Sequence, residues 1–245
     1  MVKIGIIDFN PDQNPDRRQY VKRISALIPK IQFEGLFFKN NINVAGFDAL
    51  ILSGSKLSAT DYQRMIKQSN VVGEDYIAVD KVVNVLKEFG KPMFGICFGH
   101  QIIAHIHGAR LGKLNMVEAG YLEHKLTEAG KNDSIFKNLP PVFYGSHLHS
   151  DYVVNSFKGI NAQVLATRNR YVHAIKFSQR GVVCYGTQFH PEMSNSKDAV
   201  FLVEVNAGWL ESTLSKVALT RAVTIPQKAD FNVGNLITNF VKNVR

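Results

Sequence analysis

Apolar residues recur along the N-terminal part of the chain in two alternating rhythms, short continuous runs and runs with helical spacing. The continuous runs are typical of buried strands and lie at 2–9, 31–38, 47–52 and 93–96. Between them, helical spacing predicts helices over 17–28 and 76–89, and the second ends at Gly90. Strands and helices that alternate in this way predict a parallel sheet with helices on both faces.

The pattern changes after Gly108, where strand-like segments follow one another with few helices. These segments lie at 116–126, 142–154, 163–167, 172–177 and 182–189. We expect them to extend the sheet in antiparallel or mixed fashion, before helices at 196–217 and 233–244. The predicted fold is therefore α/β: a flavodoxin-like, mostly parallel sheet with helices on both faces and an antiparallel extension. It forms one domain over 1–245, with an inserted helical segment at about 194–231 before the last helix.

Composition fits one globular domain, because 45% of the residues are hydrophobic and 20% are charged. No apolar stretch approaches the roughly 20 residues of a membrane helix, so we expect no membrane association and no signal peptide. Cys97 and Cys184 lack a metal-ligand or redox spacing, which favours a cytoplasmic protein. The net charge is +9, but Lys and Arg are spread along the chain. We interpret them as a solvated surface and expect no nucleic-acid partner.

The sequence Gly95-Ile96-Cys97-Phe98-Gly99 carries the strongest chemical signal. A strand precedes it and an apolar helical run follows it, as in the turn that presents the nucleophile of many hydrolases, here with cysteine in place of serine. A helix N-terminus stabilises a thiolate through its unpaired N–H groups. Cys97 is therefore the predicted nucleophile, whereas Cys184 lies in an apolar run and is predicted to pack in the core.

A cysteine nucleophile needs a base that later acts as an acid, and a third group that orients this base. His190 and Glu192 in Gln-Phe-His-Pro-Glu close an apolar strand, which would bring them to the same sheet edge as Cys97. His105 and His107 are two residues apart on a predicted helix and so face different ways. We therefore predict no metal site and no cofactor.

The two motifs together resemble the triad, or class I, glutamine amidotransferases, most closely stand-alone members similar to the glutaminase domain of GMP synthetase. The likeness spans nearly the whole chain. It implies that Cys97 is the nucleophile, His190 the base and acid, and Glu192 its orienter. It also implies an oxyanion hole from the backbone N–H groups of Phe98 and Ser55. Further implied contacts to glutamine come from three places in the chain: Gly54, Gln101 and the Ser150-Asp151 segment.

The chain departs from the family pattern at Ser53-Gly54-Ser55-Lys56, where Ser-Gly-Gly-Pro is usual. Ser55 must therefore tolerate the backbone of a turn that commonly holds glycine. The stretch from Met193 to Asn232 is also longer than in compact members. Its apolar residues at near-helical spacing predict a helix on the domain in preference to a docking face for a partner.

The resemblance implies hydrolysis of the glutamine side-chain amide through a γ-glutamyl thioester. The sequence contains neither a Ser-Gly-Gly-x-Asp-Ser loop nor a Walker A motif, so we expect a separate acceptor enzyme, a synthetase, to receive the ammonia. Three alternatives stay open. One is a γ-glutamyl peptidase or hydrolase on the same fold, another a non-catalytic regulatory subunit of a synthetase, and the third a general cysteine hydrolase of flavodoxin-like fold.

Overall fold

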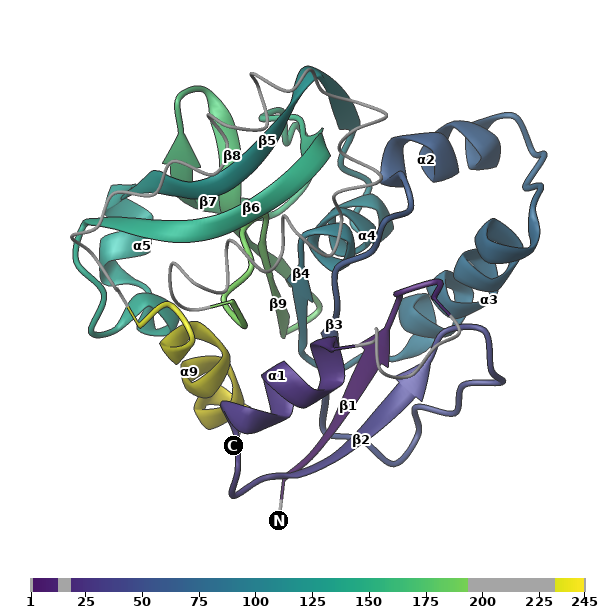
Figure 1. The fold of residues 1–245 in the computed structure, drawn as a ribbon, viewed down its shortest axis with the longest axis horizontal. Coiled ribbons are helices and arrows are strands. Elements are labelled where there is room, and N and C mark those ends of the chain that lie inside the picture. Colours follow the sequence, from purple (N-terminus) through teal and green to yellow (C-terminus); the bar gives the residue numbers. More distant parts are fainter. Residues whose placement is uncertain (1, 13–18, 194–231, 245) are drawn as a thin grey trace.

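A nine-stranded sheet organises the described part of the chain, residues 2–12, 19–193 and 232–244, in the computed structural model (Figure 1). The strands are β1 Lys3–Asp8, β2 Gln32–Phe37, β3 Ala49–Leu52, β4 Met93–Ile96, β5 Leu111–Leu126, β6 Val142–Val153, β7 Ala162–Arg168, β8 Tyr171–Gln179 and β9 Val182–Thr187. The helices are α1 Tyr20–Ala26, α2 Ala59–Lys67, α3 Glu74–Glu88, α4 Phe98–Ile106, α5 Glu128–Asn132, the short 3₁₀ helix η2 Ser134–Phe136, and α9 Asn235–Asn243.

The strands lie in the order β2-β1-β3-β4-β9-β8-β7-β5-β6. Pairing is parallel from β2 to β9 and antiparallel from β9 to β6. The predicted fold class, with its parallel sheet and antiparallel extension, is thereby confirmed. The prediction of a single domain with an inserted helical segment at about 194–231 stays a prediction, because that segment lies outside the described residues.

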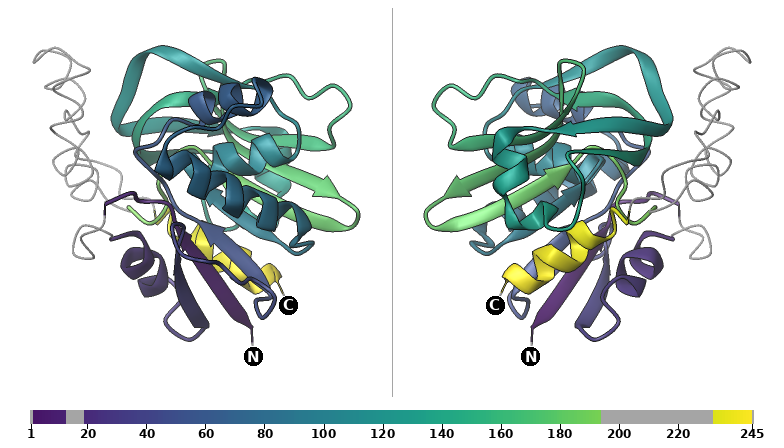
Figure 2. Two further views of the ribbon diagram at one scale, coloured as in Figure 1. Left: turned by 90° about the vertical axis from the view of Figure 1, so that its right-hand side faces the viewer. Right: turned by 90° about the vertical axis from the view of Figure 1, so that its left-hand side faces the viewer.

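Helices cover both faces of the parallel half of the sheet (Figures 1 and 2). Leu50 and Leu52 of β3 pack into a core with residues of α2, α3 and α4, whereas Ala49 and Ile51 pack into a second core with residues of α1 and α9. Successive strand residues point to opposite faces, and all four of these side chains are buried. The continuous apolar run is therefore what a central strand between two helical layers needs.

The antiparallel half of the sheet curls until β6 lies beside the end of β9. The backbone N–H of His190 donates a hydrogen bond of 2.9 Å to the Ser146 carbonyl, and the two residues form an isolated antiparallel bridge. This contact brings the C-terminal half of β6 next to the carboxyl ends of the parallel strands. Among the described residues, no helix is long and apolar enough to cross a membrane.

Two features differ from the sequence-based prediction. Helix α2 is absent from that prediction, because it is short and rich in polar residues. It begins where Ser58 accepts a hydrogen bond from the Asp61 N–H through its side chain, as an N-cap residue does. Strand β5 begins at Leu111 and not at Met116, and its pairing with β6 is interrupted between Lys113 and Glu118.

Candidate active site

Cys97 occupies the junction between the end of β4 and the start of α4. Its backbone has φ 51° and ψ −102°, a region that non-glycine residues rarely occupy and that marks strained functional positions. A side chain at Gly95 would overlap the Gly99 backbone, and one at Gly99 would overlap the Leu52 carbonyl. The two glycines of the motif therefore allow strand and helix to meet closely behind the cysteine, as a nucleophile turn requires.

The first turn of α4 points backbone N–H groups toward this end of the sheet. The Gly99 N–H donates to the Ser53 carbonyl at 3.1 Å, and the Gln101 N–H donates to the Cys97 carbonyl at 3.1 Å. The Phe98 N–H lies in the same first turn, where no intrahelical acceptor is available. The position predicted for an oxyanion donor, directly after the nucleophile, therefore suits this role.

His190 lies between Glu192 and Cys97, as the predicted triad requires. Its Nδ1 lies 2.6 Å from Glu192 Oε1, and both residues are buried. Burial by itself lowers the pKa of His190. Attraction to Glu192 and Cys97, together with hydrogen bonds to both, outweighs burial and raises the pKa to about 10. Since Glu192 occupies Nδ1, the Nε2 nitrogen is the one left for the thiol.

Tyr20 and Gly54 hold the imidazole from the other side. The Tyr20 ring stacks on the His190 ring with centroids 6.1 Å apart and planes 16° apart. A Cβ at Gly54 would lie 2.8 Å from His190 Cε1, so no other residue fits there without moving the ring. Gly54 was predicted to contact substrate. It is not among the residues that line the pocket, and the structure places it behind His190 instead.

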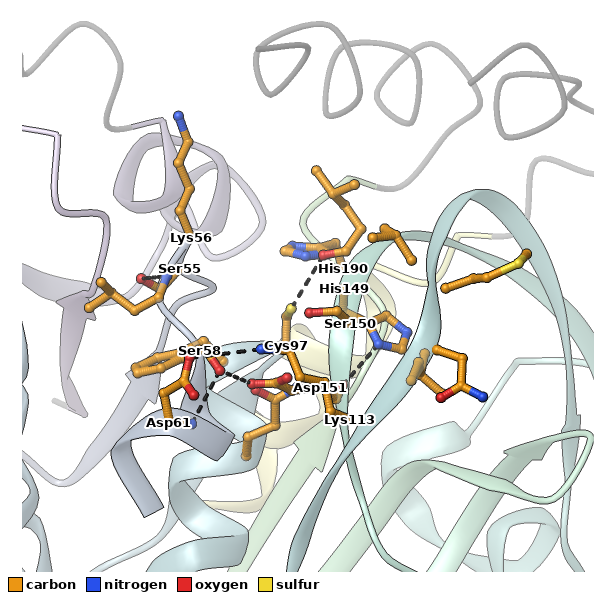
Figure 3. A pocket seen from close by; sticks show the side chains of 18 of the residues that line it. Ser55, Lys56, Ser58, Asp61, Cys97, Lys113, His149, Ser150, Asp151 and His190 are labelled. Atoms are coloured by element: carbon orange, nitrogen blue, oxygen red, sulfur yellow. Dashed lines mark hydrogen bonds and ion pairs between the residues drawn. The ribbon is translucent and has the colours of Figure 1, made fainter. Parts of the chain in front are cut away.

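A pocket of about 510 Å³ opens over Cys97 at the carboxyl ends of β3 and β4. Figure 3 shows Ser55 and Lys56 on one side of it and His149 and Ser150 on the other, with Cys97 between them. The pocket wall includes seven of the predicted site residues: Ser55, Cys97, Phe98, Gln101, Ser150, Asp151 and His190. Residues that are far apart in the sequence thus converge on one space.

Gln101 and Asp151 form the inner wall through bonds to the protein itself. The Gln101 side-chain amide donates to the Asp151 carbonyl at 2.9 Å and to Gln188 Oε1 at 3.1 Å. Asp151 Oδ2 accepts from the Ser58 hydroxyl at 2.8 Å and from the Thr60 N–H at 3.0 Å, at the start of α2. Its Oδ1 is buried and makes no hydrogen bond to any residue the structure describes.

Ser55 fits the turn at which the chain departs from its relatives. Its φ is not positive, so the backbone does not need glycine there. The hydroxyl donates to the Phe9 carbonyl at 2.7 Å and accepts from the Leu57 N–H at 3.1 Å. The serine side chain therefore ties this loop to the end of β1.

Several pocket residues are not among those predicted from the sequence. Lys113 pairs with Asp151 and Glu118 with His149, so the four residues 114–117 bulge outward opposite Ser150 and line the pocket. Ser58 and Asp61 line it from the first turn of α2. Their Ser-x-x-Asp spacing is a helix-start signal that could have revealed this part of the site.

The remaining cysteine and the histidines singled out earlier have structural surroundings. Cys184 is buried in the core as predicted, and burial raises its pKa to about 11. His105 Nδ1 lies 3.1 Å from the Gln63 side-chain amide, and His107 stacks on Phe177 with centroids 4.7 Å apart. One group with metal-ligand geometry occurs among the described residues, and it comprises Glu118, His147, His149 and His173.

Comparison with known proteins identifies the family to which this site belongs. The model of the family described as "Glutamine amidotransferase class-I" matches residues 38–206. The chain belongs to the class I glutamine amidotransferases. A subunit of the glutamine-hydrolyzing GMP synthase of Methanococcus aeolicus is 32% identical over 193 residues, 76% of this chain and 89% of that protein. The corresponding subunit in Pyrococcus abyssi is 29% identical over 180 residues, 73% of this chain and 87% of that protein.

Solved structures of class I glutamine amidotransferases share the fold. A glutamine amidotransferase from Thermotoga maritima superposes with a TM-score of 0.68 at 15% sequence identity, covering 99% of this chain and 97% of the other. The resemblance stated from the two sequence motifs is thereby confirmed, and so are the predicted enzyme class and the likeness to the GMP synthase glutaminase.

Proposed function

We propose that this amidotransferase hydrolyses the side-chain amide of glutamine with Cys97 as nucleophile, His190 as base and acid, and Glu192 as orienter. The observation that carries the proposal is the buried His190, hydrogen-bonded to Glu192 at 2.6 Å and to the Cys97 thiol. Its raised pKa of about 10 keeps the imidazole protonated at neutral pH. A protonated imidazole beside the cysteine stabilises the thiolate, which is the attacking species.

The reaction would proceed in two halves. The Cys97 thiolate attacks the amide carbon of glutamine, and the C–N bond breaks as His190 delivers its proton to the leaving nitrogen, which departs as ammonia. A γ-glutamyl thioester on Cys97 remains. Neutral His190 then takes a proton from water, whose oxygen attacks the thioester and releases glutamate and the thiolate. The proposal calls for no cofactor.

The surroundings of the pocket support this chemistry at both ends of the substrate. The backbone N–H groups of Phe98 and Ser55 would bind the oxyanion that forms at the amide carbon. Gln101, Ser150 and Asp151 would position the amino-acid end of glutamine. Asp151 Oδ1, buried without a hydrogen bond to any described residue, would accept one from the α-amino group, which supplies a positive charge.

The ammonia would pass to a separate acceptor enzyme. The relatives in Methanococcus aeolicus and Pyrococcus abyssi are named as one subunit of a GMP synthase, and the aligned part of this chain spans 89% and 87% of their lengths. We infer that the partner is a synthetase on a second chain, and we expect the two chains to divide the work between glutamine hydrolysis and ammonia transfer.

Release of glutamate and ammonia from glutamine by the purified chain tests the proposal, with and without a candidate synthetase. Cys97→Ala should abolish release, and the matched variant Cys184→Ala should keep it within severalfold. γ-Glutamyl peptides serve as competing substrates. A preference for those peptides would indicate the peptidase alternative, and a folded chain that hydrolyses neither substrate, even with the synthetase, would indicate a regulatory role.

A further inference from the structure

Three buried histidines and a glutamate converge beside the active-site pocket. Glu118 lies on β5, His147 and His149 on β6, and His173 on β8, and one potential ligand atom from each lies within 4.8 Å of all the others. The histidines are buried, and the Glu118 side chain is 18% exposed. His147 and His149 are two residues apart on one strand, so both side chains face the same way.

The nitrogens of this cluster lack the partners that buried polar atoms normally have. His149 Nε2 and His173 Nε2 lie 3.3 and 3.6 Å from Glu118 Oε2. None of these three atoms makes a hydrogen bond to any described residue, and neither does His147 Nδ1. A proton on one imidazole could satisfy one contact at most, whereas a cation at the centre would satisfy all four residues together.

Neighbouring contacts hold the imidazoles as metal ligands are usually held. His149 Nδ1 lies 2.9 Å from the Asp151 carbonyl, so Nδ1 carries the proton and Nε2 presents a lone pair toward Glu118. His147 Nε2 lies 2.8 Å from His124 Nε2. The outer oxygen of Glu118, Oε1, lies 3.3 Å from Arg168 Nε, which leaves Oε2 for the cluster.

We propose that Glu118, His147, His149 and His173 bind a zinc ion that fixes the wall of the glutamine pocket. Three imidazoles and one carboxylate oxygen are ligands that zinc accepts in tetrahedral geometry, whereas magnesium and calcium prefer all-oxygen sites. Zinc–nitrogen bonds of 2.0–2.1 Å place the ligand atoms of a tetrahedron about 3.3 Å apart. The Glu118–His149 and Glu118–His173 separations of 3.3 and 3.6 Å are close to this value.

The position of the site connects it to the pocket. Glu118 follows the 114–117 bulge directly, and His149 immediately precedes Ser150. An ion held by both residues would therefore clamp the bulge to β6 where these two segments face the substrate. The expectation of no metal site rested only on His105, His107 and the spacing of the cysteines, none of which belongs to this cluster.

Zinc binding to the chelator-stripped full chain tests the proposal, with the Cys97→Ser variant as background because the active-site thiol also attracts zinc. We expect one equivalent of zinc per chain. Zinc at a hundred times its Kd should raise the Tm by about 5–10 °C, and magnesium should not raise it. Cobalt(II) in place of zinc should show the visible absorption of a tetrahedral site.

His173→Gln and Glu118→Gln should each weaken zinc binding by at least about 10- to 100-fold, and the matched control His107→Gln should not. If the buried His173→Gln variant fails to fold, the partly exposed Glu118→Gln and the cobalt spectrum decide. The absence of stoichiometric zinc in the Cys97→Ser chain would overturn the proposal. Zinc binding unchanged by Glu118→Gln would overturn it as well.

Discussion

The close approach of Gly54 to the catalytic histidine offers a sharp perturbation. In Gly54→Ala, the new methyl group would lie 2.8 Å from His190 Cε1 and 3.1 Å from the Tyr20 hydroxyl. The first distance is about 0.6 Å shorter than the 3.4 Å at which ordinary contact begins. The imidazole must therefore swing away or the loop must retreat, and either movement disturbs the alignment of His190 with Cys97.

Misplacing a catalytic group by about 1 Å costs on the order of 100-fold in rate, so a shift of about 0.6 Å should lower kcat by roughly 10- to 100-fold. The assay is glutamate release under saturating glutamine, alongside thermal melting. The control is Gly46→Ala, because a Cβ at Gly46 would meet nothing within 4 Å and its φ is not positive. A folded Gly54→Ala enzyme that retained wild-type kcat would refute the role of His190 in this position.

Three further predictions concern residues around the triad. Glu192→Gln removes the main attraction that raises the pKa of His190 to about 10, so the high-pH limb of kcat/KM, where His190 loses its proton, should move to lower pH; an unmoved limb would contradict the assignment. Ser55→Ala loses the hydroxyl bond to the Phe9 carbonyl and should destabilise the fold by about 1 kcal/mol, measurable as a lower denaturation midpoint. Asp151→Asn should raise the KM for glutamine by roughly 10- to 100-fold with a smaller change in kcat, and an unchanged KM would exclude Asp151 as the acceptor of the α-amino group.

The parallel half of the fold and the nucleophile turn could be predicted because local sequence determines them. The β3 run is apolar at every position because it packs between two helical layers, and this alone identifies a central strand. Gly95 and Gly99 flank Cys97 because strand and helix leave no room for a side chain at either position. His190 and Glu192 end an apolar strand, so their place at the same sheet edge follows from topology.

Other parts of the site depend on long-range packing that no local pattern reveals. Helix α2 is too polar to show a clear apolar stripe, and only the Ser58 cap marks its start. The bulge at 114–117 exists because β5 and β6 change register there. The cluster of Glu118 with three histidines forms only when the antiparallel strands curl together, although the alternation of His147 and His149 on one strand was visible in the sequence.

The central claim is that glutamine becomes covalently attached to Cys97, and trapping this intermediate tests it most directly. The chain is mixed with glutamine, quenched in acid within the first turnover, and analysed by intact mass and peptide mapping. We predict a mass increase of one γ-glutamyl group, located on Cys97, which hydroxylamine releases and which Cys97→Ala lacks. An adduct on Cys184, or glutamate release that persists in Cys97→Ala, would contradict the account.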